Sequence, residues 1–525
     1  MTTRTKPSPG VVVFIGAGPG DPGLLTLRAT EVLRAADAVA VPEMLRGEIL
    51  PRCREDVEIL DITDHDGAVT GKALAAAAKT GKLVARVLPG DPTVLCDFAE
   101  EADACAKGKI AFELVPGVSS AFAVPAYAGV PVTDRRNRAV HVVDVSDHAE
   151  EPDWASLAGP RRTLVLLNCA HVLGKVAASL VEHGWKGDTP IAVTAAGTTT
   201  AQHTVVSTLD TVEKDSNALD GPSIAVVGEV VKLRDKLSWW ESKPLFGWKV
   251  LVPRTKDQAG ALSERLVGFG AVPVEVPTIA VEPPRTPQAV DRAIRGLVQG
   301  RYAWVALTSV NAVKAIREKI EELGLDARAL AGVKIACVGE QTAAAMVAWG
   351  IRPDLVPSGE QSSEGLVADW PEYDAAYDAL DRVLLPRADI ATETLAAGLL
   401  EKGWQIDDVT AYRTVRAAPP PAETREAIKS GGFDAVVFTS SSTVRNLVGI
   451  AGKPHASTII AVIGPQTAKA AAELGLRVDV QASSPSATVL VDALATFGRE
   501  RRESGEVYPP GKANKAKIVA RTKRK

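Results

Sequence analysis

Short runs of apolar, often β-branched residues alternate along the chain with longer stretches rich in alanine and leucine. In the first half these runs predict strands at 11–15, 83–87, 163–167, 191–194 and 224–227. In the second half they predict strands at 250–253, 304–308, 335–338, 383–386, 435–439 and 459–463. Strands that are apolar throughout and separated by helices are typical of parallel sheets covered on both faces. The pattern therefore predicts an α/β fold.

The second half contains an internal duplication. Residues 302–313 match 433–444, residues 334–356 match 459–481, and residues 250–270 match 383–403. The offsets of about 125 to 135 residues make each unit domain-sized rather than a solenoid repeat. Two similar lobes that face each other form a cleft, which suits one sizeable ligand.

A junction near 237–248 interrupts the alternation. Its sequence includes Trp239, Trp240 and Trp248, three of the nine tryptophans. A linker that packs against both neighbouring parts would explain these aromatic residues. An ordinary loop with a local apolar cluster explains them equally well.

Composition and charge narrow the class of protein. The chain has 525 residues, which at roughly 150 residues a domain suggests three or four domains. A hydrophobic content of 46% excludes a disordered chain, and the net charge of −4 argues against a basic nucleic-acid binder. Residues 499–525 carry a net charge of +7, so the remainder carries −11. We expect this basic end to be a disordered tail.

Five scattered cysteines and the absence of CxxC or HExxH motifs indicate neither a disulfide framework nor a zinc site. The N-terminal residues lack the apolar stretch of a signal peptide, and no run of about 18 apolar residues occurs. We therefore expect a cytoplasmic protein that binds neither membrane nor nucleic acid.

A glycine-rich loop, 16–21, follows the first predicted strand and precedes a helix. Glycines at such a place let backbone N–H groups approach a ligand at the N-terminus of a helix. Asp21 stands where the dinucleotide fingerprint GxGxxG requires its third glycine, which argues against an oxidoreductase. A plain tight turn remains the alternative for this loop on its own.

The first 240 residues or so resemble uroporphyrinogen-III C-methyltransferase, a tetrapyrrole methylase. The resemblance is carried by GAGPGDPGLLTLRA, VPGVSSAFAVPAYAGVPVT, GTTTAQHTVVSTL and GPSIAVVGEVV. It implies a two-lobed α/β domain that binds S-adenosylmethionine, and by analogy a homodimer through this half. The family's cofactor contacts fall on eight residues: Pro19, Gly90, Asp91, Val94, Ser119, Ser120, Asn168 and Gly197.

This half departs from the family at places that bear on catalysis. The family's GGDP is PGDP here, so Pro89 removes a backbone donor. The family's acidic proton acceptor is replaced by Pro42, and the neighbouring arginine by Glu43. We hypothesise a retained fold with weak or no methyltransferase activity. A fully bifunctional enzyme that also makes precorrin-2, and a non-catalytic module that supports the second half, are the alternatives.

The second half, from Gly247 to about Phe497, resembles uroporphyrinogen-III synthase. The motifs are VLVPRTKDQAGALSERL, TSVNAV, VGEQTA, LLPRADIATETLAAGL, VTAYRTV, FTSSSTV and IGPQTA, in that order. The resemblance implies cyclisation of hydroxymethylbilane to uroporphyrinogen III with inversion of ring D and loss of water, in haem, sirohaem or cobalamin biosynthesis. Such a reaction needs an enclosed site that folds a flexible octacarboxylate, and no cofactor or metal.

The loops that follow predicted strands in this half supply suitable groups. Each is expected to meet a helix N-terminus, where an anion is favoured. The predicted substrate-binding residues are Arg254, Thr308, Ser309, Asn311, Gly339, Thr342, Arg387, Thr439, Ser440, Ser441, Gly464 and Thr467. Helix capping is the ordinary use of the Thr and Ser residues, and a surface ion pair that of Arg254 and Arg387.

Tyr412, in VTAYRTV, falls on the family's tyrosine that assists departure of the hydroxyl. A phenol beside the leaving oxygen can donate a hydrogen bond as a general acid. The alternative is a tyrosine that packs at the end of a strand.

The resemblances set the expected domain boundaries. Residues 1–10 form a flexible N-terminus, 11–240 a methylase-like domain and 241–248 a linker. Residues 249–498 form a two-lobed synthase, with one lobe of about 249–280 plus 417–498 and another of about 281–416. Its doubly wound parallel-sheet lobes are joined by a two-strand linker, and the basic tail begins at 499.

Overall fold

The computed structural model describes residues 10–505 except 63–65, 147–150, 160, 218, 220, 255 and 391–392. The chain divides into two compact units. The first consists of Met1–Val250, Ser263–Pro273 and Val491–Lys525, and the second of Leu251–Leu262 and Val274–Leu490. Among the described residues, no helix is both long and apolar enough to cross a membrane.

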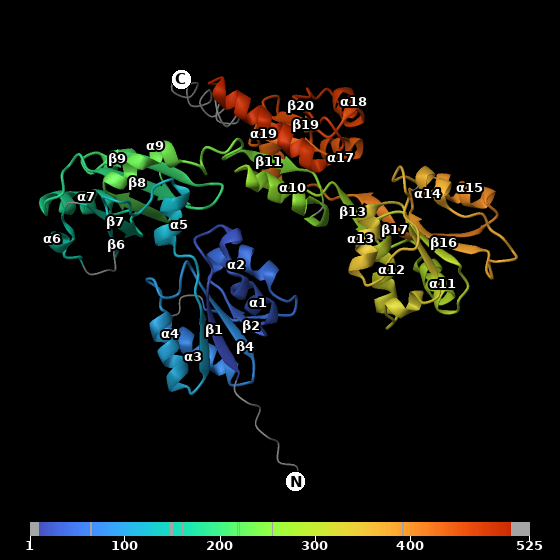
Figure 1. Ribbon diagram of the computed structural model, residues 1–525, viewed down its shortest axis with the longest axis horizontal. Coiled ribbons are helices and arrows are strands. Elements are labelled where there is room, and N and C mark those ends of the chain that lie inside the picture. The colour runs from blue at the N-terminus through green and yellow to red at the C-terminus, as the bar shows by residue number, and fades with distance from the viewer. Residues whose placement is uncertain are drawn as a thin grey trace, which may run out of the picture. The chain divides into compact units, whose positions relative to one another are not determined.

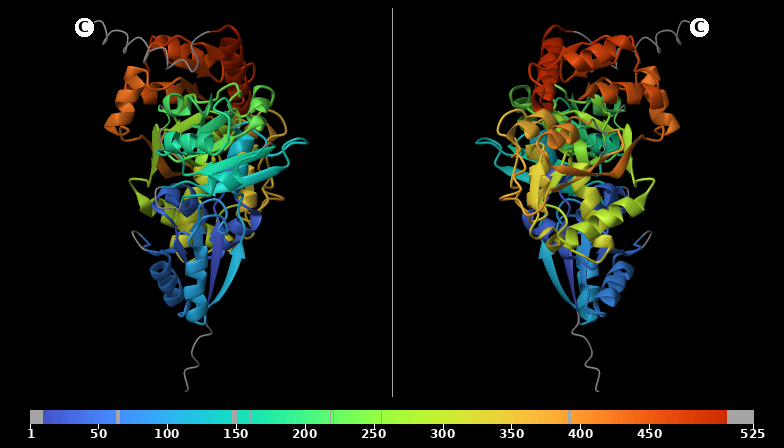
Figure 2. Two further views of the ribbon diagram at one scale, coloured as in Figure 1. Left: turned by 90° about the vertical axis from the view of Figure 1, so that its left-hand side faces the viewer. Right: turned by 90° about the vertical axis from the view of Figure 1, so that its right-hand side faces the viewer.

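The first sheet is wholly parallel and has the strand order β3-β2-β4-β1-β5. The strands are β1 (Val11–Gly16), β2 (Ala38–Ala40), β3 (Glu58–Ile59), β4 (Leu83–Leu88) and β5 (Ala111–Val115). The helices are α1 (Leu27–Ala35), α2 (Glu43–Ile49), α3 (Gly67–Ala78) and α4 (Phe98–Lys107). Helices α3 and α4 lie side by side (Figures 1 and 2). Successive residues of β1 enter two different buried clusters, so both faces of this sheet are covered as predicted.

The second sheet, with the order β6-β7-β10-β8-β9, is mixed. Its strands are β6 (Ala139–Asp144), β7 (Arg162–Leu167), β8 (Pro190–Ala195), β9 (His203–Thr208) and β10 (Ser223–Val227). The helices of this region are α5 (Ser120–Tyr127), α6 (Trp154–Leu157), α7 (Leu173–Glu182), α8 (Val212–Ser216) and α9 (Arg234–Leu237).

Only β6 and β7 of this sheet are parallel, so the expectation of parallel pairing was wrong for most of it. Strand β9 returns antiparallel to β8, and β10 enters between β7 and β8 in the antiparallel direction. Both β8 and β10 are almost wholly buried. A central strand is apolar whichever way it runs, so the hydrophobic pattern did not reveal the direction.

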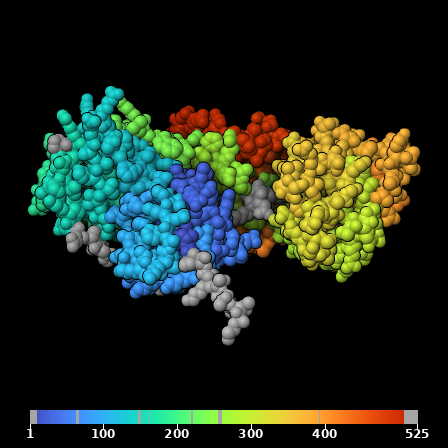
Figure 3. Space-filling model, turned by 60° about the horizontal axis from the view of Figure 1, so that its bottom comes forward, coloured from blue at the N-terminus to red at the C-terminus, as the bar shows by residue number. Residues whose placement is uncertain are grey.

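The third and fourth sheets share one strand order. The third is β12-β11-β18-β19-β20. In the fourth, β17-β16-β14-β15 repeats the first four of these strands, and β13 is added antiparallel to β17. The third contains β11 (Lys249–Val252), β12 (Val272–Glu275), β18 (Ala435–Phe438), β19 (Ile459–Val462) and β20 (Val480–Gln481). The fourth contains β13 (Ile279–Glu282), β14 (Trp304–Leu307), β15 (Lys334–Cys337), β16 (Arg382–Ala388) and β17 (Gln405–Arg416). The fourth sheet belongs to the body coloured yellow to orange in Figure 3.

The helices of the second half begin with α10 (Lys256–Gly268), α11 (Pro287–Val298), α12 (Val310–Glu322), α13 (Glu340–Ala348) and α14 (Ser363–Asp369). They continue with α15 (Thr394–Glu401), α16 (Ala422–Ser430), α17 (Ser441–Ala451), α18 (Pro465–Glu473) and α19 (Ala487–Glu503). Helix α19 includes 499–503, which were predicted to be disordered, so that part of the prediction was wrong. The rest of the predicted tail, 506–525, lies outside the described residues.

The duplication read from the sequence is confirmed down to single hydrogen bonds. Asp354 accepts a hydrogen bond from the backbone N–H of Ile335 at 2.8 Å, through Oδ2. Asp479 accepts one from the N–H of Ile460 at 2.9 Å in the same way. These two pairs occupy matching places at β15 and β19, so the two lobes share local structure as well as strand order.

Candidate active sites

The second unit contains a cavity of about 720 Å³. Three of the predicted site residues line it, namely Arg254, Asn311 and Tyr412. Arg254 follows strand β11, Asn311 lies in the first turn of α12, and Tyr412 lies on β17. The cavity is therefore formed by residues from both halves of the duplication. Its size falls in the usual range for sites that bind small molecules.

Tyr412 is the best-defined polar group of this cavity. Its side chain is largely buried, and its Oη lies 2.8 Å from Oγ of Ser309. Ser309 is the N-cap residue of α12 and accepts a hydrogen bond from the N–H of Ala312 at 3.1 Å. Either hydroxyl can donate in the contact between Ser309 and Tyr412. When Ser309 donates, the phenolic hydrogen is left for another acceptor. Burial raises the pKa of Tyr412, so the phenol keeps its proton at neutral pH.

The two arginines predicted as substrate ligands differ in their surroundings. Arg254 lines the cavity, and burial lowers the pKa of its guanidinium, which remains charged at any ordinary pH. Arg387 is buried and donates from Nε to Asp408 at 2.8 Å and from Nη2 to Glu393 at 2.9 Å. It does not line the cavity. The ion-pair alternative therefore describes Arg387 better than substrate binding does.

The other predicted loops run from strands into helices, as expected. Ser309, Gly339, Ser440 and Gly464 are the N-cap residues of α12, α13, α17 and α18. Thr342 and Thr467 are buried one turn further on. Apart from Ser309, which reaches the cavity through Tyr412, the structure does not bring this group to the cavity: Thr308, Gly339, Thr342, Thr439, Ser440, Ser441, Gly464 and Thr467 are absent from its lining.

Local bonds account for most of the loop before α17. Ser440 forms a capping box with Thr443, and Ser441 donates to the carbonyl oxygen of Gln466 at 2.9 Å. Oγ1 of Thr439 is buried and has no hydrogen-bond partner within the described part of the chain. The capping alternative is therefore realised at Ser440.

Sequence reasoning missed one face of α12. Besides Asn311, the cavity is lined from this helix by Val310, Lys314, Ala315, Glu318, Lys319 and Glu322. These positions repeat at the spacing of one helical face, and that spacing could have identified them once Asn311 was suspected. Lys319 forms an ion pair with Glu322 at 3.0 Å. With Arg254, the described part of the lining thus contains three cations, two of them the lysines of this helix.

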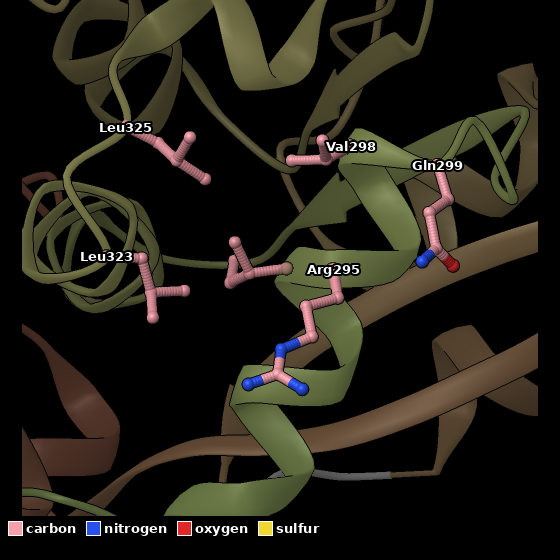
Figure 4. A pocket seen from close by; sticks show the side chains of 6 residues that line it. Arg295, Val298, Gln299, Leu323 and Leu325 are labelled. Atoms are coloured by element: carbon pink, nitrogen blue, oxygen red, sulfur yellow. The ribbon is translucent and has the colours of Figure 1, made fainter.

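A smaller cavity of about 260 Å³ lies beside α11. Figure 4 shows Val298, Leu323 and Leu325 around it, with Arg295 at its rim. No predicted site residue lines it, and its surface is mainly apolar.

In the first unit, the predicted cofactor loops after β1 and β4 are joined by their backbones. Gly18 donates to the carbonyl oxygen of Gly90 at 3.1 Å, and Gly90 donates back at 2.9 Å. Asp91 accepts a hydrogen bond from the N–H of Gly117 at 2.9 Å, which ties in the loop after β5. A Cβ on Gly117 would lie 2.1 Å from the carbonyl oxygen of Gly90, so this approach requires glycine.

The remaining cofactor candidates adjoin these loops. Ser119 is the N-cap residue of α5, and Ser120 begins that helix. A Cβ on Gly197 would collide with Val124 of α5, so the loop after β8 packs tightly on this helix. Pro19 follows the Gly18–Gly90 bridge directly.

Val94 and Asn168 lie at the edge of this group. Val94 packs against the buried cluster of Ala121, Val165 and Leu167, and Asn168 follows that cluster in the chain. Asn168 donates from Nδ2 to Oδ1 of Asp144 at 3.0 Å. The structure therefore brings all eight predicted cofactor residues into one region of the first unit.

These loops hold much of the strained backbone of the described chain. Six described non-glycine residues have left-handed φ, and four of them lie here: Leu95, Asn168, Ala196 and Thr198. Such conformations cost roughly 1 kcal/mol or more each and persist where the surroundings enforce them. Among the described residues, no cluster of His, Cys, Asp or Glu could hold a metal ion.

The departures from the methylase pattern have visible structural consequences. Pro42 is the N-cap residue of α2 and makes no side-chain capping bond. Glu43, which follows it, forms an ion pair with Arg46 at 2.5 Å. The carboxylate of Glu43, which stands in place of the family's arginine, is therefore paired with a cation of the same helix.

Comparisons with known proteins agree with both resemblances. A family model described as tetrapyrrole (corrin/porphyrin) methylases matches residues 11–213, and one described as uroporphyrinogen-III synthase HemD matches residues 260–492. A curated relative, the porphyrin biosynthesis protein HemD of Ruminiclostridium josui, is 32% identical over 95% of this chain and 99% of its own length. The chain belongs to this HemD family. It joins a tetrapyrrole methylase domain to a uroporphyrinogen-III synthase domain, which places it in tetrapyrrole biosynthesis.

Other relatives of this HemD family member match one half only. The siroheme synthase of Psychromonas ingrahamii is 36% identical over 44% of this chain and 51% of its own length, so the chain spans about half of that relative. The uroporphyrin-III C-methyltransferase structure from Thermus thermophilus is 30% identical over 44% of this chain and 97% of that one, with a TM-score of 0.39. A uroporphyrinogen III synthase mutant from Thermus thermophilus is 21% identical over 49% of this chain and 100% of that one, with a TM-score of 0.34.

Proposed function

We propose that the cavity lined by Arg254, Asn311 and Tyr412 is the place where hydroxymethylbilane is cyclised to uroporphyrinogen III. One observation carries the proposal: a buried phenol lines the cavity, and its oxygen is held by Ser309 at the start of α12. A neutral phenol fixed in this way can donate a hydrogen bond to a leaving hydroxyl group.

The residues of the cavity then have distinct tasks. Tyr412 donates to the hydroxyl oxygen as it leaves, while the pyrrole nitrogen assists and an azafulvene cation forms. Arg254 and Lys314 bind acetate or propionate side chains of the substrate, and the amide of Asn311 adds a neutral donor. The cavity holds the chain of four rings in a folded conformation, so that closure through the spiro intermediate is faster than direct closure.

The decisive experiment supplies hydroxymethylbilane to the full-length chain and separates the two uroporphyrinogen isomers. We expect isomer III in excess over the spontaneous isomer I. Isomer I alone would refute the proposal.

We further propose that the first half binds S-adenosylmethionine but has weak or no methyltransferase activity. The bonds between Gly18 and Gly90 hold two loops together. Other backbone amides and carbonyls of these loops, with the start of α5 at Ser119 and Ser120, are available to the methionine part of the cofactor. Bound there, the cofactor would supply an electrophilic methyl group. Pro42 cannot take up the proton that methylation of a pyrrole carbon releases.

Two measurements separate the alternatives for this half. Calorimetric titration with S-adenosylmethionine tests binding, and a methylation assay with uroporphyrinogen III tests turnover. Conversion to precorrin-2 at ordinary enzyme rates would show a bifunctional enzyme and contradict the second part of the proposal. The homodimer stays a prediction that sedimentation velocity of the full-length chain tests.

A further inference from the structure

The segment Trp239–Lys243, between α9 and β11, contacts the predicted cofactor loops of the first unit. Trp239 donates from Nε1 to the carbonyl oxygen of Ala126 at 3.0 Å, in α5. Trp240 donates from Nε1 to the carbonyl oxygen of Thr199 at 2.8 Å, in the loop after β8. The segment is therefore packed, and Trp239 and Trp240 lie against the methylase domain.

Glu241, in the middle of this segment, is inserted among polar groups of the methylase domain. Its side chain is 15% exposed and that of its ion-pair partner Arg234 is 13% exposed, with 2.7 Å between Nη2 and Oε2. Its other oxygen, Oε1, accepts hydrogen bonds from Nε2 of Gln202 at 2.8 Å and from Oγ1 of Thr204 at 2.5 Å. Charge-assisted bonds in such shielded surroundings are stronger than neutral ones.

Gln202 connects Glu241 to the glycine loops through hydrogen bonds. It is 2% exposed, and its Oε1 accepts a hydrogen bond from the N–H of Thr198 at 2.8 Å. Oγ1 of Thr198 in turn accepts one from the N–H of Asp21 at 3.0 Å. Three successive hydrogen bonds thus run from Glu241 to the loop after β1.

Thr198 needs an external restraint of this kind. Its φ of 67° is left-handed, a conformation that a β-branched residue adopts only at a cost in free energy. The bond from its N–H to Gln202 offsets that cost, and Gln202 is itself oriented by Glu241. Removing the carboxylate leaves the amide of Gln202 free to rotate, so Thr198 loses a fixed acceptor.

Aromatic packing forms a second connection to the same loop. Tyr127 donates from its hydroxyl to Oδ2 of Asp21 at 2.9 Å. Its ring centre lies 5.0 Å from that of Trp239 and 4.9 Å from that of Trp240. Lys243 places its Nζ 3.9 Å from the ring centre of Trp240.

The segment is also held from its other side, within the same unit. Arg502 of α19 donates to the backbone carbonyl oxygens of Glu241 at 3.1 Å and Lys243 at 3.3 Å. Two further residues, Leu245 and Phe269, are joined by a backbone hydrogen bond of 3.0 Å. The place of Glu241 is therefore set by contacts that do not involve the cofactor loops.

We propose that Glu241 is a positioning residue for the cofactor site: through Gln202 it fixes Thr198 and Asp21, and so shapes the glycine loops that receive S-adenosylmethionine. The inference rests on the cofactor binding proposed above. The proposal assigns the segment between the two halves a role in shaping the methylase cofactor site.

The test is calorimetric titration of S-adenosylmethionine into the full-length chain. The variants are Glu241→Gln, which keeps the shape of the side chain, Gln202→Leu, and the two combined. Glu229→Gln is the matched control, because Glu229 forms an exposed ion pair with Lys232 at 2.7 Å in the same domain. Thermal unfolding of every variant, followed by circular dichroism, reports whether the substituted domain is folded.

We expect each single variant to weaken binding about tenfold, since each removes a bond to a charged or buried group. The double variant should weaken it little further, because both residues act through one relay. Tenfold losses that multiply, or unchanged affinity in Glu241→Gln, would overturn the inference alone. No binding by the unaltered chain would overturn the proposed cofactor function, and this inference with it.

Discussion

The two lobes of the synthase domain have the same strand order, yet equivalent positions meet different partners. Arg254 and Arg387 are equivalent residues at the ends of matching strands: Arg254 follows β11, and Arg387 lies near the end of β16. Arg254 lines the cavity, whereas Arg387 is held by Asp408 and Glu393. The duplicated fold therefore places an arginine at the same position twice, but of the two only Arg254 lines the cavity.

The same holds for the residues around Tyr412. Gly270 and Gly403 are equivalent and both left-handed, and counting an equal distance onward places Ile279 where the other lobe has Tyr412. Both Ile279 and Tyr412 line the cavity, but only one carries a hydroxyl group. Of these two equivalent positions only Tyr412 offers a hydroxyl group, which suits the proposed reaction at one end of a linear substrate.

The largest effect is expected from Tyr412→Phe. Loss of the phenolic hydroxyl should lower synthase turnover about 100-fold, in the range typical of a lost general acid. The measurement is the initial rate of formation of isomer III. Tyr302→Phe is the control, since Tyr302 is also buried and donates to Asp407 but does not line the cavity. If Tyr412→Phe and Tyr302→Phe formed isomer III at equal rates, Tyr412 would not be the general acid.

The two arginines should separate binding from stability. Arg254→Gln is expected to raise KM for hydroxymethylbilane about tenfold, because a charge-assisted contact to a carboxylate is lost. Arg387→Gln should instead lower the free energy of unfolding by about 2 kcal/mol, since it leaves Asp408 and Glu393 without their cation. Denaturant unfolding and steady-state kinetics check both. If Arg387→Gln raised KM and left the free energy of unfolding unchanged, Arg387 would be a substrate-binding residue after all.

The two capping serines offer a smaller contrast. Ser309→Ala and Ser440→Ala should each lower the free energy of unfolding by about 1 kcal/mol, because each removes an N-cap. Only Ser309→Ala should also lower turnover, by about fivefold, since only Ser309 contacts Tyr412. An equal loss of turnover in Ser440→Ala would show that both lobes serve the reaction.

The smallest effect concerns pH. Burial raises the pKa of Tyr412 above the ordinary tyrosine value of about 10, so the folded state holds this proton more tightly than the unfolded state does. The stability gained in this way is complete below about pH 10 and is lost as pH rises through the folded-state pKa. The ultraviolet absorption of tyrosinate, compared between the unaltered chain and Tyr412→Phe, measures it. A phenolate that forms below pH 10 would contradict the expectation.

Much of this organisation could be predicted from the sequence, because apolar runs and capping residues act locally. The strands, the duplication and the strand-to-helix loops all follow from such patterns. The direction of β10 could not be predicted, since a buried central strand has the same composition either way. The difference between Arg254 and Arg387 depends on Asp408, 21 residues away from Arg387 in the chain. The route from Glu241 to Asp21 joins residues whose proximity only the fold creates.

The indoles of Trp239 and Trp240 have one more consequence. Two of the nine tryptophans lie against the loops that are proposed to receive the cofactor, and one of them donates directly to the backbone of the loop after β8. Indole emission responds to the charge and hydration around the ring. The ring of Trp240 lies 4.9 Å from that of Tyr127 and 3.9 Å from the ammonium nitrogen of Lys243. Trp239 and Trp240 therefore act as intrinsic fluorophores beside the glycine loops. A change in these loops on cofactor binding is expected to change their fluorescence, without an added dye.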